Sequence, residues 1–176
     1  MAKPRINGTL TAEQVRAALD YDPETGLFVW KQRLDMSVQW NGQYAGHPAG
    51  GPRRIGYRYI AINSRRYASH RLAWVIMTGE WPETEMDHKD GNPSNNRWDN
   101  LRLASREQNL ANIRGHKDSR CGLKGATYNK LRGTWQAQIM ANRKVYHLGV
   151  FPTAQEAHEA YCAAAIRLKG EFARTA

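Results

Sequence analysis

The sequence predicts an α+β protein built from two small domains. Its 176 residues, 41% of them hydrophobic, exceed the needs of one minimal domain and are short for two full-sized ones. Short strand-like and helix-like segments occur on both sides of a polar stretch without periodicity, residues 114–121, which has the composition of a linker. We therefore expect a domain over residues 1–113, a linker over 114–121 and a second domain over 122–176.

In the first domain, Thr11 and Gln14 form a capping-box pattern, and a helix is expected to run from there to about Asp20. Turn residues over 21–26 precede a strand over 27–30. Residues 35–55, rich in Gly, Gln and Pro, are expected to be irregular.

The segments 57–62 and 67–69 flank a polar stretch and are predicted to form a hairpin. A short apolar helix over 70–78 should end at Gly79, a residue type common after helix C-termini.

A strand over 86–88 then leads into a polar loop, and a second strand over 101–103 follows it. Ser105 and Gln108 repeat the capping-box pattern, which predicts a helix to about residue 113. This strand–loop–strand–helix order can gather distant side chains around one site.

The second domain contains three strand-like segments, 124–129, 134–140 and 145–150. Thr153 and Glu156 cap a following helix with an apolar face, and Gly170 closes it. The expected fold is a small three-stranded antiparallel sheet with one packed helix.

The chain carries 26 Lys and Arg against 16 Asp and Glu, a formal charge of +10. This excess favours a polyanionic partner, usually nucleic acid, although a solvated basic surface is the alternative. No apolar stretch is long enough to span a bilayer, and the first residues lack a secretory signal, so we expect no membrane partner. With only two cysteines, Cys121 and Cys162, we expect a reducing, intracellular setting without disulfides.

Polar side chains with hydrolytic potential follow the strand over 86–88. Phosphodiester hydrolysis requires a base that activates water and a cation that neutralises developing charge. His88 is a candidate base, and Asp87 and Asn109 offer the hard oxygen ligands that Mg²⁺ or Mn²⁺ prefers. The alternative is a surface Asp–His hydrogen bond beside an Asn-rich turn.

Residues 69–112 closely resemble the HNH homing-type endonucleases of phage genomes and mobile introns. The matching pieces are His70-Arg71-Leu72, residues 87–92, Asn100-Leu101-Arg102 and Gln108-Asn109. The resemblance implies a ββα-metal (His-Me finger) nuclease region and cleavage of double-stranded DNA in one or both strands.

The resemblance also implies roles. His88 is implied as the general base, and Asn100 as the second residue of the catalytic motif, whose side chain braces the loop and aims the histidine. Asp87 and Asn109 are implied as metal ligands. Asn109 departs from the commoner histidine at its position. His70 opens an apolar helix and is expected to be structural, and no zinc is expected because paired Cys-x-x-Cys motifs are absent.

Residues 123–173 resemble the Apetala-two, or ethylene-response-factor, DNA-binding domain. From residue 114 to 150 there are eight Lys or Arg against one acid, with aromatic residues between them. The resemblance implies DNA contacts at six positions: Lys124, Thr127, Asn129, Arg132, Trp135 and Gln138.

The predicted function is therefore a metal-dependent DNA endonuclease, monomeric and acting in the bacterial cytoplasm during phage infection. Two rival hypotheses remain open: a DNA-binding transcriptional regulator that keeps the nuclease region as a scaffold, and a phage packaging or repair nuclease. The presence of Asp87, His88, Asn100 and Asn109 together favours the enzyme over the regulator.

Overall fold

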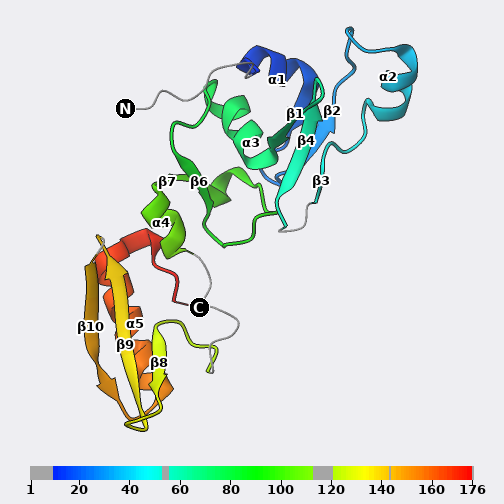
Figure 1. Cartoon of the computed structure of the whole chain (residues 1–176). Coiled ribbons are helices and arrows are strands. Elements are labelled where there is room, and N and C mark those ends of the chain that lie inside the picture. The colour runs from blue at the N-terminus through cyan, green and yellow to red at the C-terminus, as the bar shows by residue number, and fades with distance from the viewer. Residues whose placement is uncertain (1–9, 53–55, 113–120, 143, 176) are drawn as a thin grey trace. The chain divides into compact units, whose positions relative to one another are not determined.

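The structure is a computed structural model that describes residues 10–52, 56–112, 121–142 and 144–175 (Figure 1). The chain divides into two compact units, Met1–Leu103 and Ala104–Ala176. Both contain helices and small antiparallel sheets, so the predicted α+β class is confirmed. The expected linker falls almost wholly outside the described residues, as do the basic residues Arg114, Lys117, Arg120 and Arg143.

The first unit begins with the predicted capping box. Helix α1 (Ala12–Ala18) starts at Thr11, whose hydroxyl accepts from Gln14 N while the Gln14 side chain accepts from Thr11 N. The chain then passes directly into β1 (Leu19–Tyr21), which pairs antiparallel with β2 (Phe28–Trp30).

Residues 35–55 are not irregular throughout, and that expectation was wrong. Helix α2 (Val38–Tyr44) lies within them, with Ser37 accepting from Trp40 N as its N-cap, and β3 (Gly51–Pro52) follows. No residue of α2 is buried, so the helix leaves no apolar periodicity in the sequence.

The predicted hairpin is confirmed as β4 (Arg58–Ile62) and β5 (Arg65–Ala68). Its turn contains two residues, Asn63 and Ser64, with φ of 51° and 62°. Positive φ at both turn positions is typical of the tight turns that match the twist of a hairpin. Helix α3 (Ser69–Thr78) follows and ends at Gly79, which has a φ of 87° as expected for a left-handed cap.

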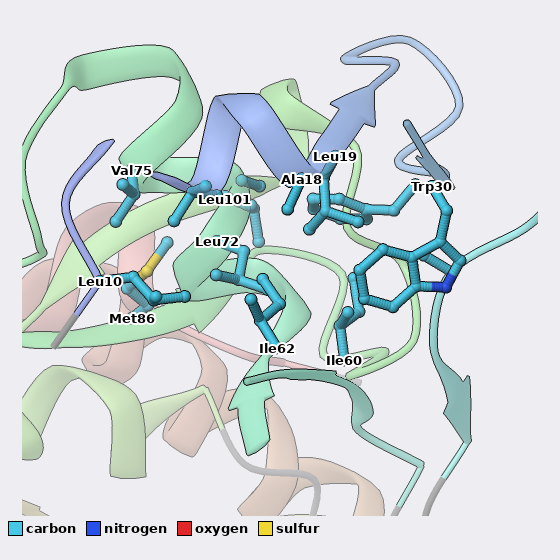
Figure 2. Close-up of a cluster of buried hydrophobic side chains, with 14 residues drawn as sticks. Leu10, Ala18, Leu19, Trp30, Ile60, Ile62, Leu72, Val75, Met86 and Leu101 are labelled. Atoms are coloured by element: carbon cyan, nitrogen blue, oxygen red, sulfur yellow. The ribbon is translucent and has the colours of Figure 1, made fainter. Parts of the chain in front are cut away.

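One apolar cluster holds the first unit together (Figure 2). It combines side chains from α1, the β1–β2 hairpin, β4 and α3 with Met86 and Leu101, which flank the predicted site. Val15, Ile60, Leu72 and Val75 are fully buried in it. The strand that carries Asp87 and His88 is thereby fixed to the core through Met86.

Strand β6 (Glu85–His88) pairs with β7 (Leu101–Ala104), and the short 3-10 helix η1 (Trp98–Asn100) leads into β7. Helix α4 (Arg106–Ala111) then begins at the predicted capping box of Ser105 and Gln108. The predicted strand–loop–strand–helix order is therefore present along the chain.

In the second unit, β8 (Ala126–Asn129), β9 (Thr134–Ala141) and β10 (Lys144–Phe151) form an antiparallel sheet in the order β10-β9-β8. Helix α5 (Ala154–Lys169) packs on one face of this sheet, and η2 (Gly170–Phe172) follows it (Figure 1). This confirms the three-stranded sheet with one packed helix. In the part of the chain that the structure describes, no helix has the length and apolar character needed to cross a membrane.

Candidate active site

Asp87 and His88 lie at the end of β6 and are both buried, each with 4% of its surface exposed. Successive side chains of a regular strand point to opposite faces. Here the strand ends at His88 and the chain turns at once, with Gly91 N donating to His88 O at 2.7 Å. The two polar side chains are thus withdrawn from bulk water at a strand end that is fixed to the core.

Asn96 sets the tautomer of His88. The Nε2 atom of His88 lies 3.2 Å from Oδ1 of Asn96, whose side chain is also buried. An amide oxygen can only accept a hydrogen bond, so Nε2 carries the proton and Nδ1 is the basic nitrogen. Burial lowers the pKa of His88 below its ordinary value, while Asn96 and nearby carboxylates oppose the shift. The imidazole is therefore neutral at pH 7.

His70 and Tyr57 lie beside the His88 ring. The centroid of the His70 ring is 5.2 Å from that of His88, and the Tyr57 ring is 5.5 Å from His70 and 5.9 Å from His88. Burial lowers the pKa of His70 to about 3, with smaller contributions from His88 and Arg71. Within the described residues, the buried Nδ1 of His70 has no hydrogen-bond partner. The histidine expected to be merely structural is thus a neighbour of the candidate base.

Asn100 braces the loop that follows His88. Its Oδ1 accepts from Asp90 N at 3.0 Å, and its Nδ2 donates to Asp90 Oδ1 at 3.0 Å and to Asn95 O at 2.8 Å. Its backbone carbonyl accepts from Lys89 N at 2.9 Å. One buried amide thus connects the start of the loop to its later part.

Arg102, on the partner strand β7, forms a buried ion pair with Asp87. Its Nε and Nη2 atoms donate to Oδ2 of Asp87 at 2.9 and 2.8 Å. Both side chains are largely withdrawn from solvent. A buried carboxylate is costly unless it is paired, and Arg102 offsets that cost.

A family model described as HNH endonuclease matches residues 67–111. Protein 3.8 of Escherichia phage T7 is 37% identical over 95 residues, which span 53% of this chain and 76% of that protein.

The chain belongs to the HNH endonuclease family.

Members of this family hydrolyse DNA phosphodiester bonds. A solved structure described as DNA binding and cleavage by the HNH homing endonuclease I-HmuI is also similar, with 19% identity and a TM-score of 0.39. The similarity covers 86% of this chain and 85% of that one.

The HNH match spans β5 to α4 and includes Asp87, His88, Asn100 and Asn109. Asp87, His88 and Asn100 belong to the first unit, whereas Asn109 lies on α4 in the second. No group of three or more His, Cys, Asp or Glu suited to hold a metal ion occurs among the residues described. Mg²⁺ commonly keeps several water ligands and binds through one or two carboxylates together with phosphate.

The C-terminal sheet has one face away from α5, and strand register shows which residues share it. Thr127 is paired with Gln136, and Asn129 with Thr134, on the face opposite to the buried Ala126 and Ala137. Gln138 alternates with Ala137 and is exposed on the same outer face. Arg132 is exposed in the turn between β8 and β9.

Two of the six residues expected to contact DNA lie elsewhere. Trp135 follows the register of Ala137 and packs with the cluster of Ala126, Ala137 and Ala157, so its ring is on the helix side of the sheet. Lys124 is half-buried, and its Nζ donates to Ala111 O at 2.9 Å. The packing of the Trp135 ring and the hydrogen bond of the Lys124 ammonium therefore give both residues a role within the folded domain.

Three residues near the HNH motif were not found by sequence reasoning: Tyr57, Asn96 and the ion-pairing role of Arg102. Asn96 lies in a loop that also contains Asn92 and Asn95, so residue type alone does not distinguish it. The signal that identifies it is burial, since it is 2% exposed. Arg102 lies on β7, the strand that pairs with β6, so a contact with the acidic Asp87 was a possibility that residue type and strand pairing together could have suggested.

Proposed function

We propose that the chain is a metal-dependent DNA endonuclease of the phage homing type, in which His88 is the general base. The observation that carries this proposal is the buried His88, which burial favours as a neutral imidazole, with its Nε2 atom 3.2 Å from Asn96 and its position directly after the buried Asp87. The relationship to a protein of phage T7 supports a phage setting.

In this mechanism, Nδ1 of His88 takes a proton from the water that attacks the phosphorus. Asn96 orients the ring by accepting from Nε2, and Asn100 holds the loop that carries Asn96. The neutral state of His88, favoured by burial, is the state that can accept a proton.

Asp87 and Asn109 are the proposed metal ligands. Carboxylate and amide oxygens are hard donors, a chemistry that fits Mg²⁺ or Mn²⁺. A cation bound there would neutralise the charge that develops on the phosphate and the leaving oxygen.

The test is incubation of the purified protein with supercoiled phage DNA, with Mg²⁺ or with EDTA. We expect nicking or linearisation that requires the cation and is lost in His88→Ala, because removing a general base costs about a hundredfold or more in rate. The matched control is His47→Ala, which removes an exposed histidine from another loop. Cleavage by His88→Ala at the wild-type rate would refute the assignment, whereas DNA binding should survive that substitution.

We further propose that the outer face of the C-terminal sheet binds double-stranded DNA through Thr127, Asn129 and Gln138, with Arg132 on a phosphate. The polar character of this face and the resemblance to the Apetala-two domain support the proposal. The slope of log K against log salt is negative, and Arg132→Ala should make it shallower by about one unit. Arg167→Ala, an exposed arginine on α5, should leave the slope unchanged.

A further inference from the structure

Helix α4 carries the third residue of the HNH motif and belongs to the same compact unit as the C-terminal sheet, Ala104–Ala176. The helix has only six residues, Arg106–Ala111. Isolated helices of this length are unstable in water. The position of Asn109 must therefore be set by the groups that hold α4.

Lys124 holds the C-terminal end of α4. Its ammonium donates to Ala111 O at 2.9 Å, and a positive charge at the last carbonyls of a helix is favourable. The carbonyl of Lys124 accepts from Nδ1 of His158 on α5 at 2.8 Å. A single residue thus joins the end of α4 to the segment before β8 and to the helix of the sheet domain.

Glu107 holds the beginning of α4. Its Oε1 accepts from the backbone N of Asn142 at 2.6 Å. Asn142 lies in the turn between β9 and β10 and has a φ of 52°, a tight turn conformation that fixes the direction of its N–H. The first turn of α4 is thereby connected to the end of the sheet.

An apolar contact holds the side of α4. Ala104, Ala111 and Phe172 form a cluster, and Phe172 is only 6% exposed. Phe172 lies in η2, directly after α5. The helix is therefore attached to the C-terminal domain at its start, its end and its side.

We propose that Glu107 and Lys124 are positioning residues for the cleavage reaction, through which the C-terminal sheet domain holds Asn109 in place. This inference rests on the proposed function. Asn109 lies between these two attachment points, so loss of either one loosens the helix that carries it. It also gives Lys124 a role other than DNA contact. The domain then contributes to catalysis as well as to affinity.

The test uses the full-length chain with four substitutions. Glu107→Ala and Lys124→Met remove one attachment each, and Lys124→Met keeps most of the aliphatic stem. Glu107→Gln is the conservative variant, because its amide oxygen still accepts from Asn142 N. Glu159→Ala is the matched control, since this exposed acid of α5 bonds Gln155 on its own helix.

Two readouts separate positioning from simple stability. In single-turnover cleavage at saturating DNA, Glu107→Ala and Lys124→Met should be about tenfold slower and require more Mg²⁺ for half-maximal rate, with unchanged DNA affinity. Without metal or DNA, hydrogen exchange at the amides of Asn109 and Asn112 should accelerate about tenfold. Glu107→Gln and Glu159→Ala should behave as wild type in both measurements.

Weakened DNA binding by Lys124→Met with an unchanged saturating rate would make Lys124 a phosphate contact and overturn the proposal. A lower melting temperature with normal cleavage and normal exchange in α4 would also overturn it. If the wild-type chain fails to cleave DNA, the proposed function itself is refuted. If the wild type cleaves and the variants match its rate, only the positioning role is refuted.

Discussion

Replacing Asn100 with alanine removes the brace of the loop that follows His88. Three side-chain hydrogen bonds are lost, at 3.0, 3.0 and 2.8 Å, and the N–H of Asp90 loses its acceptor. At roughly 1 kcal/mol for each hydrogen bond, the free energy of unfolding should fall by about 3 kcal/mol. The cleavage rate should fall by about a hundredfold, because a small displacement of the proposed base His88 from its productive position is costly.

Asn41→Ala is the matched control, because it removes a similar brace from another loop. The Asn41 side chain accepts from Arg33 N and donates to Arg33 O, both at 2.8 Å. Urea unfolding followed by tryptophan fluorescence should show comparable losses of stability in the two variants. Plasmid cleavage, measured below both unfolding transitions, should fall only in Asn100→Ala. Equal activity in the two variants would refute the idea that Asn100 acts by positioning His88.

Three further predictions concern individual residues. Burial lowers the pKa of His70 in the folded chain to about 3, below the ordinary value of 6.5 that applies to the unfolded chain. As pH falls, the unfolded chain therefore binds a proton at this residue before the folded chain does, and stability should be lost between about pH 6.5 and pH 3. His70→Phe should reduce this loss in urea titrations across that pH range. An unchanged decrease of stability with falling pH would contradict the lowered pKa of His70. Arg102→Ala should cost about 3–5 kcal/mol in the same assay because it leaves Asp87 buried without its ion pair; a loss below 1 kcal/mol would indicate a solvated carboxylate. Gly125→Ala should prevent folding of the C-terminal unit, because a Cβ there would lie 2.1 Å from the Tyr161 ring and φ is +81°; an intact near-ultraviolet circular dichroism spectrum would contradict this.

Local sequence signals predicted most of the secondary structure. The capping boxes at Thr11 and Ser105 and the glycine after α3 mark helix ends through short-range hydrogen bonds and backbone sterics, so they can be recognised without tertiary information. Helix α2 was missed because it buries no side chain, and its cap residue Ser37 is common in turns.

The site was predictable only to the extent that its residues are adjacent in sequence or belong to a known motif. Asp87, His88 and Asn100 follow from the motif. The buried contact of Asn96 with His88 and the pairing of Arg102 with Asp87 depend on how the loop folds back, and alternation along a strand does not encode that. The attachment of α4 was likewise hidden, because Glu107 and Asn142 are far apart in the chain.

The β1–β2 hairpin contacts the same loop from outside the family match. The hydroxyl of Tyr21 donates to Asn96 O at 2.7 Å, and Trp98 N donates to Pro23 O at 2.9 Å. A Cβ at Gly26 would lie 2.5 Å from the backbone of Asn96 and Arg97. A fragment limited to the matched segment, 67–111, would therefore lose the hairpin that packs against this loop. A transfer of this motif into another protein has to include the hairpin. Substitutions in the hairpin turn can in turn change the position of Asn96, and through it the orientation of the His88 ring.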